Sequence, residues 1–239
     1  MGAFGGAMMA AQLSESQQHY IGHRERLRAR LLERGADSLA DYELLELVLF
    51  AAIPQRDVKP LAKELLDRFG SFAEAVAAPR ERLREFKWLK DSAVAQLKVV
   101  EAAAVRLAQT RVVGKAALSS WNALLDYCAA AMARASEEQF RVLFLDRKNV
   151  LIQDRVMNRG TVDHAPVYPR EIVKLALELS ASALILVHNH PSGDPTPSRA
   201  DIDMTREVVE AARALRIAVH DHIVIGRGGT ASFKALGLI

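Results

Sequence analysis

The sequence predicts an all-α domain over residues 20–110 followed by an α/β domain over residues 111–239. The first part has only helical periodicity, and its helices stop at glycines such as Gly35 and Gly70, a common way to end a helix. From Glu138 onward, short runs rich in β-branched residues alternate with amphipathic segments. That alternation of strands and helices is typical of an α/β layer architecture.

The helical part follows residues 1–19, which lack the positively charged region of a signal peptide and are expected to be a disordered leader. Ser38 and Asp41 are candidate N-caps for the second helix, and Pro54 ends it. Helices are expected over residues 23–34, 42–52 and 58–69, with three short helices after Ser71, Pro79 and Asp91.

The second part begins with a linker and a helix over residues 121–134. Turn signals at residues 147–149 and 226–229 bound the runs that predict strands. Strands are expected over residues 140–146, 150–156, 183–188 and 218–225, and helices over residues 169–180 and 198–216.

Bulk properties exclude several classes of protein. The single cysteine, Cys128, rules out an intramolecular disulfide framework or a thiolate zinc cluster and is expected in the core of a helix. The longest apolar run, near residues 181–187, is far shorter than the roughly 20 residues that span a bilayer, so we expect no membrane partner and a cytoplasmic protein. With 32 basic and 29 acidic side chains, net charge alone does not indicate nucleic-acid binding.

The clearest chemical signal is His188-Asn189-His190 at the end of a buried strand. Because strand side chains alternate with period two, both imidazoles are expected on the same face. Ser198 is a candidate N-cap of the next helix, which places Asp201 in its first turn, able to point back at the strand end. Two imidazoles and a carboxylate suit Zn²⁺ with a fourth position open to water, as in catalytic zinc sites. Such a site also needs a base that is not a ligand, and several carboxylates are available.

The spacing His-x-His, seven residues, Ser, two residues, Asp matches the JAMM metal site of JAB/MPN domains. Within that superfamily, residues 188–201 closely resemble the bacterial RadC-like proteins. Segments such as Tyr168-Pro-Arg-Glu-Ile-Val and Asp221-His-Ile-Val-Ile-Gly extend the resemblance, which covers about residues 20–239. It implies a cytidine-deaminase-like layout for the second domain and a zinc-dependent metallopeptidase or isopeptidase acting on a protein or peptide.

The resemblance also implies roles for individual residues. His188, His190 and Asp201 would bind the metal, and Ser198 would help to stabilise the oxyanion. The catalytic base would fall on Glu138, with Glu137 beside it and Glu171 as alternatives; a helix-dipole role is the plain explanation of Glu171. Asp221 and His222 would support the first site. The second His-x-His, at residues 220–222, is expected to place both imidazoles on one face, but no further ligands for a second metal are visible.

The helical half contains candidates for contact with DNA. An arginine-rich helix includes Arg24 and Arg28, which could meet phosphate or form a solvated face. This half resembles helix-hairpin-helix proteins, but residues 88–90 stand where the glycines of the hairpin are expected, which disfavours close backbone approach to phosphate. Side-chain charge on Lys87 and Lys90 would then have to replace these backbone contacts.

Three functions therefore stay open at the level of sequence. A zinc-dependent hydrolase is favoured by the complete set of metal ligands. A DNA-transaction factor, linked to repair or recombination, is supported by the arginine-rich helix and the hairpin register. A non-catalytic MPN scaffold is disfavoured because such relatives typically lose metal ligands. The fold does not name the substrate.

Overall fold

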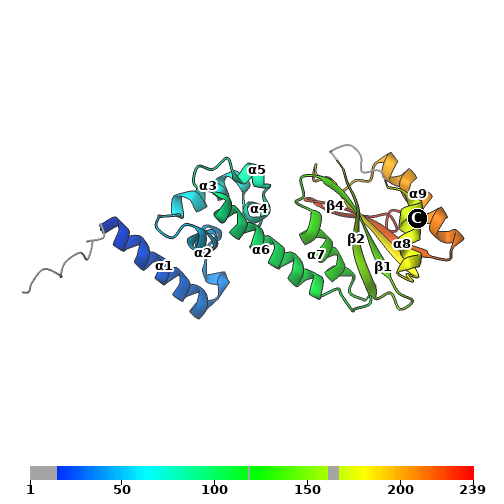
Figure 1. Cartoon of the computed structure of the whole chain (residues 1–239), viewed down its shortest axis with the longest axis horizontal. Coiled ribbons are helices and arrows are strands. Elements are labelled where there is room, and N and C mark those ends of the chain that lie inside the picture. The colour runs from blue at the N-terminus through cyan, green and yellow to red at the C-terminus, as the bar shows by residue number, and fades with distance from the viewer. Residues whose placement is uncertain (1–14, 118, 161–166) are drawn as a thin grey trace, which may run out of the picture. The chain divides into compact units, whose positions relative to one another are not determined.

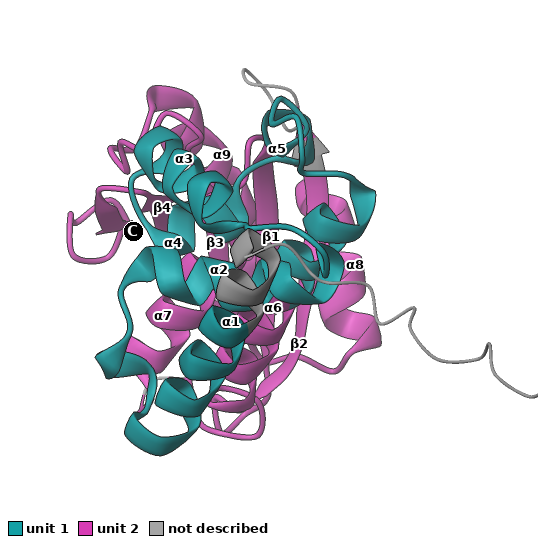
Figure 2. Ribbon diagram, turned by 90° about the vertical axis from the view of Figure 1, so that its left-hand side faces the viewer, with its two compact units in different colours: residues 1–99 teal, residues 100–239 magenta. Residues whose placement is uncertain are grey.

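The computed structural model describes residues 15–117, 119–160 and 167–239, so residues 1–14 of the expected leader lie outside the description. The chain forms two compact units, residues 1–99 and 100–239 (Figure 2). Helix α6, Asp91–Thr110, spans this division. The helical region followed by an α/β domain confirms the predicted fold class.

Unit 1 is built from helices around an aliphatic core. Leu45, Leu49, Leu65, Leu83 and Leu97 are completely buried there. The helices before α6 are α1 (Glu15–Arg34), η1 (Ala36–Ser38), α2 (Asp41–Ala52), α3 (Lys59–Phe69), α4 (Phe72–Ala77) and α5 (Arg80–Leu83). Residues 15–19, placed in the leader by the sequence prediction, belong to α1.

The ends of these helices agree only partly with the sequence prediction. Gly35 and Gly70 follow α1 and α3 with positive φ, as expected for glycine after a helix. The predicted N-caps of α2 are wrong, because its N-cap is Ala40, whose N–H donates to the Glu43 carboxylate. Asp41 instead accepts a hydrogen bond from the N–H of Phe72, at the start of α4, so its carboxylate ties two helices together.

Unit 2 is a five-stranded sheet flanked by helices (Figure 1). The strand order is β2-β1-β3-β4-β5, in which β3 and β4 are parallel and the other neighbours antiparallel. β5 is absent from the sequence prediction because its four residues follow a glycine turn and lack a β-branched run. The elements are α7 (Trp121–Met132), β1 (Glu138–Leu145), β2 (Leu151–Gly160), α8 (Pro169–Glu178), β3 (Ala183–Asn189), α9 (Arg199–Ala214), β4 (Ala218–Gly226) and β5 (Gly229–Ser232).

The sheet separates two cores. On the α7 face, Leu143, Ile185 and Ile223 pack with buried residues of α7. On the α8/α9 face, Phe140 and Leu186 pack with buried residues of α8 and α9. Because side chains alternate along a strand, His188 shares the α8/α9 face with Leu186.

A β-bulge in β4 makes the expected common face of His220 and His222 wrong. Leu184 pairs with Val219 while the next residue, Ile185, pairs with Asp221, so His220 is one residue in excess. A bulge of this kind shifts the alternation of side chains. Val219 packs on the α8/α9 face, whereas His220 lines a cavity with Trp121 of α7, its Nε2 2.6 Å from Asn149 Oδ1.

Over the described ranges, no helix is long and apolar enough to cross a membrane.

Candidate metal centre

Three metal-binding side chains meet where β3 ends and α9 begins. His188 lies in β3 with no exposed surface, and His190 follows the strand by one residue. The N-cap of α9 is Ser198, whose Oγ accepts a hydrogen bond from the Asp201 N–H, while Asp201 Oδ2 accepts one from the Ser198 N–H at 2.7 Å. This reciprocal capping box turns the Asp201 carboxylate back toward the strand end.

The ligand atoms of these residues converge. The Nε2 atoms of His188 and His190 are 2.9 Å apart. Asp201 Oδ1 lies 3.2 Å from Nε2 of His188, and Oδ2 lies 3.4 Å from Nε2 of His190. All three residues offer an atom within 4.8 Å of the others, a group consistent with a metal site. The expected meeting of strand end and helix start is therefore present.

Hydrogen bonds set the protonation of His190. Its Nδ1 lies 2.8 Å from the carbonyl oxygen of Asp194, in the loop between β3 and α9. A carbonyl only accepts, so Nδ1 carries the proton and donates. In the neutral ring, Nε2 then presents its lone pair toward Asp201.

A buried chain of hydrogen bonds sets the protonation of His188. Thr205 Oγ1 donates to the carbonyl oxygen of Asp201 at 2.5 Å, so it must accept from His222 Nδ1, 2.6 Å away. Nε2 of neutral His222 is then the acceptor for His188 Nδ1–H, across 2.7 Å. His188 Nε2 is left as a lone pair facing Asp201, the arrangement that outer partners of metal-binding histidines provide.

The environment of His222 keeps that ring neutral. Phe233 stacks on it with ring centroids 4.5 Å apart, and Phe140 presents an edge-on contact at 5.6 Å. Burial, together with the neighbouring His188, holds the pKa of His222 well below its ordinary value. A neutral His222 is what the chain of hydrogen bonds requires.

The donor set fits a cation. Two imidazole lone pairs and a carboxylate face one another within hydrogen-bond range, an arrangement that is repulsive unless positive charge lies between them. Burial raises the pKa of Asp201, and the hydrogen bond from the Ser198 N–H acts in the opposite direction because it stabilises the charged carboxylate. The carboxylate is therefore charged and ready to bind a metal.

Glu138 occupies the neighbouring strand but is outside this group. β1 pairs with β3 so that Phe140 lies opposite His188, and continuing that register by two residues places Glu138 opposite His190. Glu138 and Phe140 are two residues apart in β1, so their side chains are expected on the same face of the sheet, the α8/α9 face that also carries His188. Its side chain is half-buried.

The rivals of Glu138 lie elsewhere. Glu171 is exposed in the first turn of α8, where its Oε1 is 3.3 Å from Nε of the adjacent Arg170. That position matches the helix-dipole explanation. The side chain of Glu137 is exposed, and its carbonyl oxygen accepts a hydrogen bond from Asn189.

Of the predicted supporting residues, Glu171 is distant in α8, and the two on β4, Asp221 and His222, differ in their contacts. His222 reaches His188 directly. Asp221 points to the opposite side of β4, where its Oδ2 accepts from the Ser232 hydroxyl and its Oδ1 from the N–H groups of His222 and Lys234. Asp221 therefore fastens β4 to the C-terminal segment and affects the centre only through the backbone of His222.

Sequence reasoning missed Thr205 and Asn189. Thr205 follows Asp201 by four residues, so helical periodicity puts the two on one face of α9, a signal that could have found it. Asn189 is completely buried, and its carboxamide bonds the backbone of β1. Only the strand register reveals that contact.

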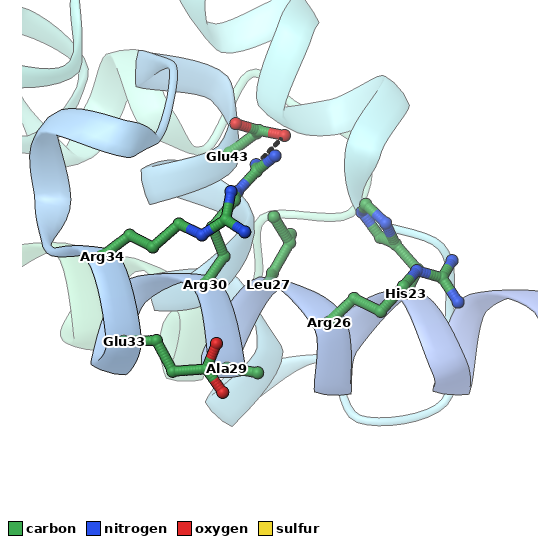
Figure 3. Close-up of a pocket in the computed structure, with 8 residues that line it drawn as sticks. All are labelled: His23, Arg26, Leu27, Ala29, Arg30, Glu33, Arg34 and Glu43. Atoms are coloured by element: carbon green, nitrogen blue, oxygen red, sulfur yellow. Dashed lines mark ion pairs between the residues drawn. The ribbon is translucent and has the colours of Figure 1, made fainter.

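In unit 1, two of the five arginines of α1, Arg24 and Arg30, are engaged by hydrogen bonds or an ion pair within the protein. Arg24 is buried over the Phe50 ring, with its guanidinium donating to the carbonyl oxygens of Ile53 and Arg56, so it is unavailable to phosphate. Arg28 is exposed. A cavity of about 410 Å³ lies along α1. Figure 3 shows the residues that line it, among which Arg30 is ion-paired with Glu43.

The segment predicted to be hairpin-like, residues 88–90, has two exposed side chains, Trp88 and Lys90, on either side of a buried one. Lys90 precedes α6, and its carbonyl accepts from the first turn of that helix. Leu89 is buried, and its N–H donates to the Phe86 carbonyl, so this amide is not free for a phosphate. Trp88 is 41% exposed, with the Arg56 guanidinium 3.5 Å from its ring centroid and Lys87 Nζ at 5.0 Å.

Comparison with known proteins agrees with this architecture. The five-stranded sheet and the His-His-Asp group at one strand end belong to a JAB domain, a class that the family comparison shows, and the group is consistent with a metal site. Residues 118–238 match the RadC-like JAB domain, and residues 19–95 match the UPF0758 N-terminal domain. The chain belongs to the RadC-like JAB family. A UPF0758 protein of Rhodobacter capsulatus is 63% identical over 213 residues, which cover 89% of this chain and 100% of that protein.

Proposed function

We propose that this protein is a zinc-dependent hydrolase that cleaves an amide or isopeptide bond in a protein or peptide. The observation that carries the proposal is the convergence of two imidazole lone pairs and a charged carboxylate. The hydrogen bonds at Nδ1 of His190 and His188 favour the tautomer in which Nε2 of each ring is free to bind a metal.

Zinc suits this set better than calcium or magnesium, which prefer oxygen ligands. Three protein ligands leave a fourth position for water, and zinc bound there would supply Lewis acidity and lower the pKa of that water. The side chain of His188 is 1% exposed and that of His190 is 18% exposed. We therefore infer that substrate approaches from the side of His190.

Residues of the chain supply the remaining chemistry. Glu138 would take a proton from the attacking water and return it to the leaving nitrogen. The Ser198 Oγ accepts from the Asp201 N–H, and its own O–H would donate to the developing oxyanion. Asp194 and His222 hold the two imidazoles, which prevents their rotation during the reaction.

The test combines zinc binding with peptide and isopeptide hydrolysis. Glu138→Gln is expected to bind Zn²⁺ as the wild type does but to lose about 100-fold or more in kcat. His188→Ala is expected to lose zinc binding. Glu137→Gln and Glu171→Gln are the matched carboxamide controls and should keep full activity. Equal activity of Glu138→Gln and the wild type removes Glu138 from the mechanism, and zinc binding insensitive to His188→Ala removes the site.

A second candidate function, single-stranded DNA binding by unit 1, is favoured by the exposed Trp88 between cationic side chains. An aromatic ring beside Lys87 and Arg56, with Lys90 two residues further along the chain, is suited to stack a base and meet phosphates. Binding should weaken steeply with salt, and each lysine-to-alanine change should reduce the salt slope by about one. A gel shift that shows no complex at low salt would remove this function.

A further inference from the structure

We propose that Asn189, between the two predicted histidine ligands, is a positioning residue that holds the backbone of Glu138 beside the metal. This inference rests on the proposed hydrolase function, because it concerns the base of that reaction. Asn189 has no exposed surface, and burial of a carboxamide is favourable only when its polar atoms are bonded.

The carboxamide bonds the backbone on both sides of Glu138, to Gln139 in β1 and to Glu137 just before it. Its Oδ1 accepts from the Gln139 N–H at 2.9 Å, and its Nδ2 donates to the Glu137 carbonyl oxygen at 3.1 Å. The partners are an obligate donor and an obligate acceptor, so the orientation of the amide is fixed.

These two bonds lie on the two peptide units that flank the Cα of Glu138. The Glu137 carbonyl belongs to the unit before that Cα, and the Gln139 N–H belongs to the unit after it. Because peptide units are planar, holding both of them restrains the backbone dihedral angles of Glu138 and hence the direction of its Cα–Cβ bond.

The two Asn189 hydrogen bonds, which together form a clamp on Glu138, lie where the regular pairing of β1 and β3 ends. The last paired residues are Phe140 and His188, and beyond them the His190 N–H donates to the Ile225 carbonyl of β4. The Asn189 side chain therefore continues the connection from β3 to β1 past the end of the ladder. One residue thus ties the strand that carries the histidines to the strand that carries Glu138.

Asn189 can do this without competing for the metal. His188 lies on the α8/α9 face, and alternation directs the adjacent side chain away from it. No step of hydrolysis requires the carboxamide itself. We therefore assign Asn189 to positioning rather than to contact with substrate.

The test compares wild type, Asn189→Ala and Asn189→Asp in the full-length protein. Asn189→Ala removes both bonds, whereas Asn189→Asp retains the acceptor for Gln139 but cannot donate to Glu137. Tyr127→Phe is the control for general destabilisation, because it removes a buried hydrogen bond to Asp154 on the α7 face. Amide exchange at Gln139, zinc affinity, and kcat and KM for a peptide or isopeptide that the wild type cleaves are measured for each.

In Asn189→Ala, exchange of the Gln139 amide should accelerate about tenfold, while in Asn189→Asp it should stay closer to the wild type. kcat of Asn189→Ala should fall about 10- to 100-fold because the base is misplaced. KM should be unchanged, and zinc affinity should change by less than about tenfold, the smallest loss typical of outer partners of metal ligands. Tyr127→Phe should leave kcat unaltered.

The results separate this inference from the proposed function. Normal turnover in Asn189→Ala beside lost turnover in Glu138→Gln would overturn the role of Asn189 and leave the hydrolase intact. An unchanged Gln139 exchange rate in Asn189→Ala would overturn the clamp itself. A wild type that cleaves no peptide or isopeptide would overturn the hydrolase and, with it, any catalytic role for Asn189.

Discussion

Thr205 offers a sharp test of how the protein prepares His188 for a metal. Thr205→Val keeps the shape of the side chain but removes the oxygen that accepts from His222 Nδ1–H and donates to the Asp201 carbonyl. All of these groups lie in the interior. A buried donor left without a partner costs about 1–3 kcal/mol, which is the expected loss in free energy of unfolding.

The same change should weaken zinc binding. Without the Thr205 oxygen, His222 is free to carry its proton on Nε2 and donate to His188 Nδ1. His188 would then carry its own proton on Nε2, the atom that faces Asp201, where it opposes metal binding. Loss of an outer partner typically costs 10- to 100-fold in affinity, and we expect about tenfold because one imidazole intervenes.

The assay is zinc competition against a chromophoric chelator, with urea unfolding in EDTA measured alongside. Thr205→Ser retains the hydroxyl and is the matched control, so its zinc affinity should stay close to that of the wild type. Equal zinc affinity in wild type and Thr205→Val, or equal losses in the Ser and Val variants, would refute the assignment of tautomers.

Three further predictions concern the same unit. A Cβ at Gly226 would lie 2.3 Å from the Gly193 carbonyl oxygen, so Gly226→Ala should displace the loop that holds His190. We expect this variant to lose about 1–3 kcal/mol of stability and to bind zinc more weakly. Gly228→Ala is the control because its Cβ would lie 3.4 Å from the same oxygen, and equal behaviour of the two variants would contradict the prediction. The pKa of His222 is lowered in the folded protein, so below about pH 6.5 a proton binds this ring in the unfolded chain but not in the folded one. The free energy of unfolding of the metal-free protein should therefore fall by up to about 1.4 kcal/mol per pH unit in that range. Urea titrations that show a constant free energy of unfolding there would disprove the prediction. Burial first, and then Asp154, raise the pKa of Cys128 to about 12, so a disulfide reagent should react only on unfolding, and rapid reaction of the native protein would argue against this burial.

The sequence was informative where local chemistry decides the structure. The positions of His188, His190 and Asp201 follow from strand alternation and helix capping, both of which act within a few residues. Most strands and helices could be predicted for the same reason. Their ends are predicted less well: α1 begins at Glu15 instead of residue 23, and α6, expected to be a short helix, extends from Asp91 to Thr110. Helix ends are hard to predict because caps such as Ala40 depend on a neighbouring side chain rather than on their own.

What could not be predicted depends on contacts between distant segments. Arg24 belongs to a basic helix in sequence, yet its burial is decided by carbonyl groups about 30 residues away. The bulge at His220 comes from pairing between β3 and β4 and leaves no local signature. The role proposed for Asn189 likewise rests on a register that brings together residues about 50 positions apart.

The bulge also divides β4 into two segments that can vary independently. Removing His220 would restore continuous pairing, with Val219 and Asp221 still opposite Leu184 and Ile185. The face on which His222 lies would not change. We therefore expect that relatives can gain or lose a residue at this point without disturbing the histidine cluster, so that a gap in an alignment there would be no sign of a lost metal site.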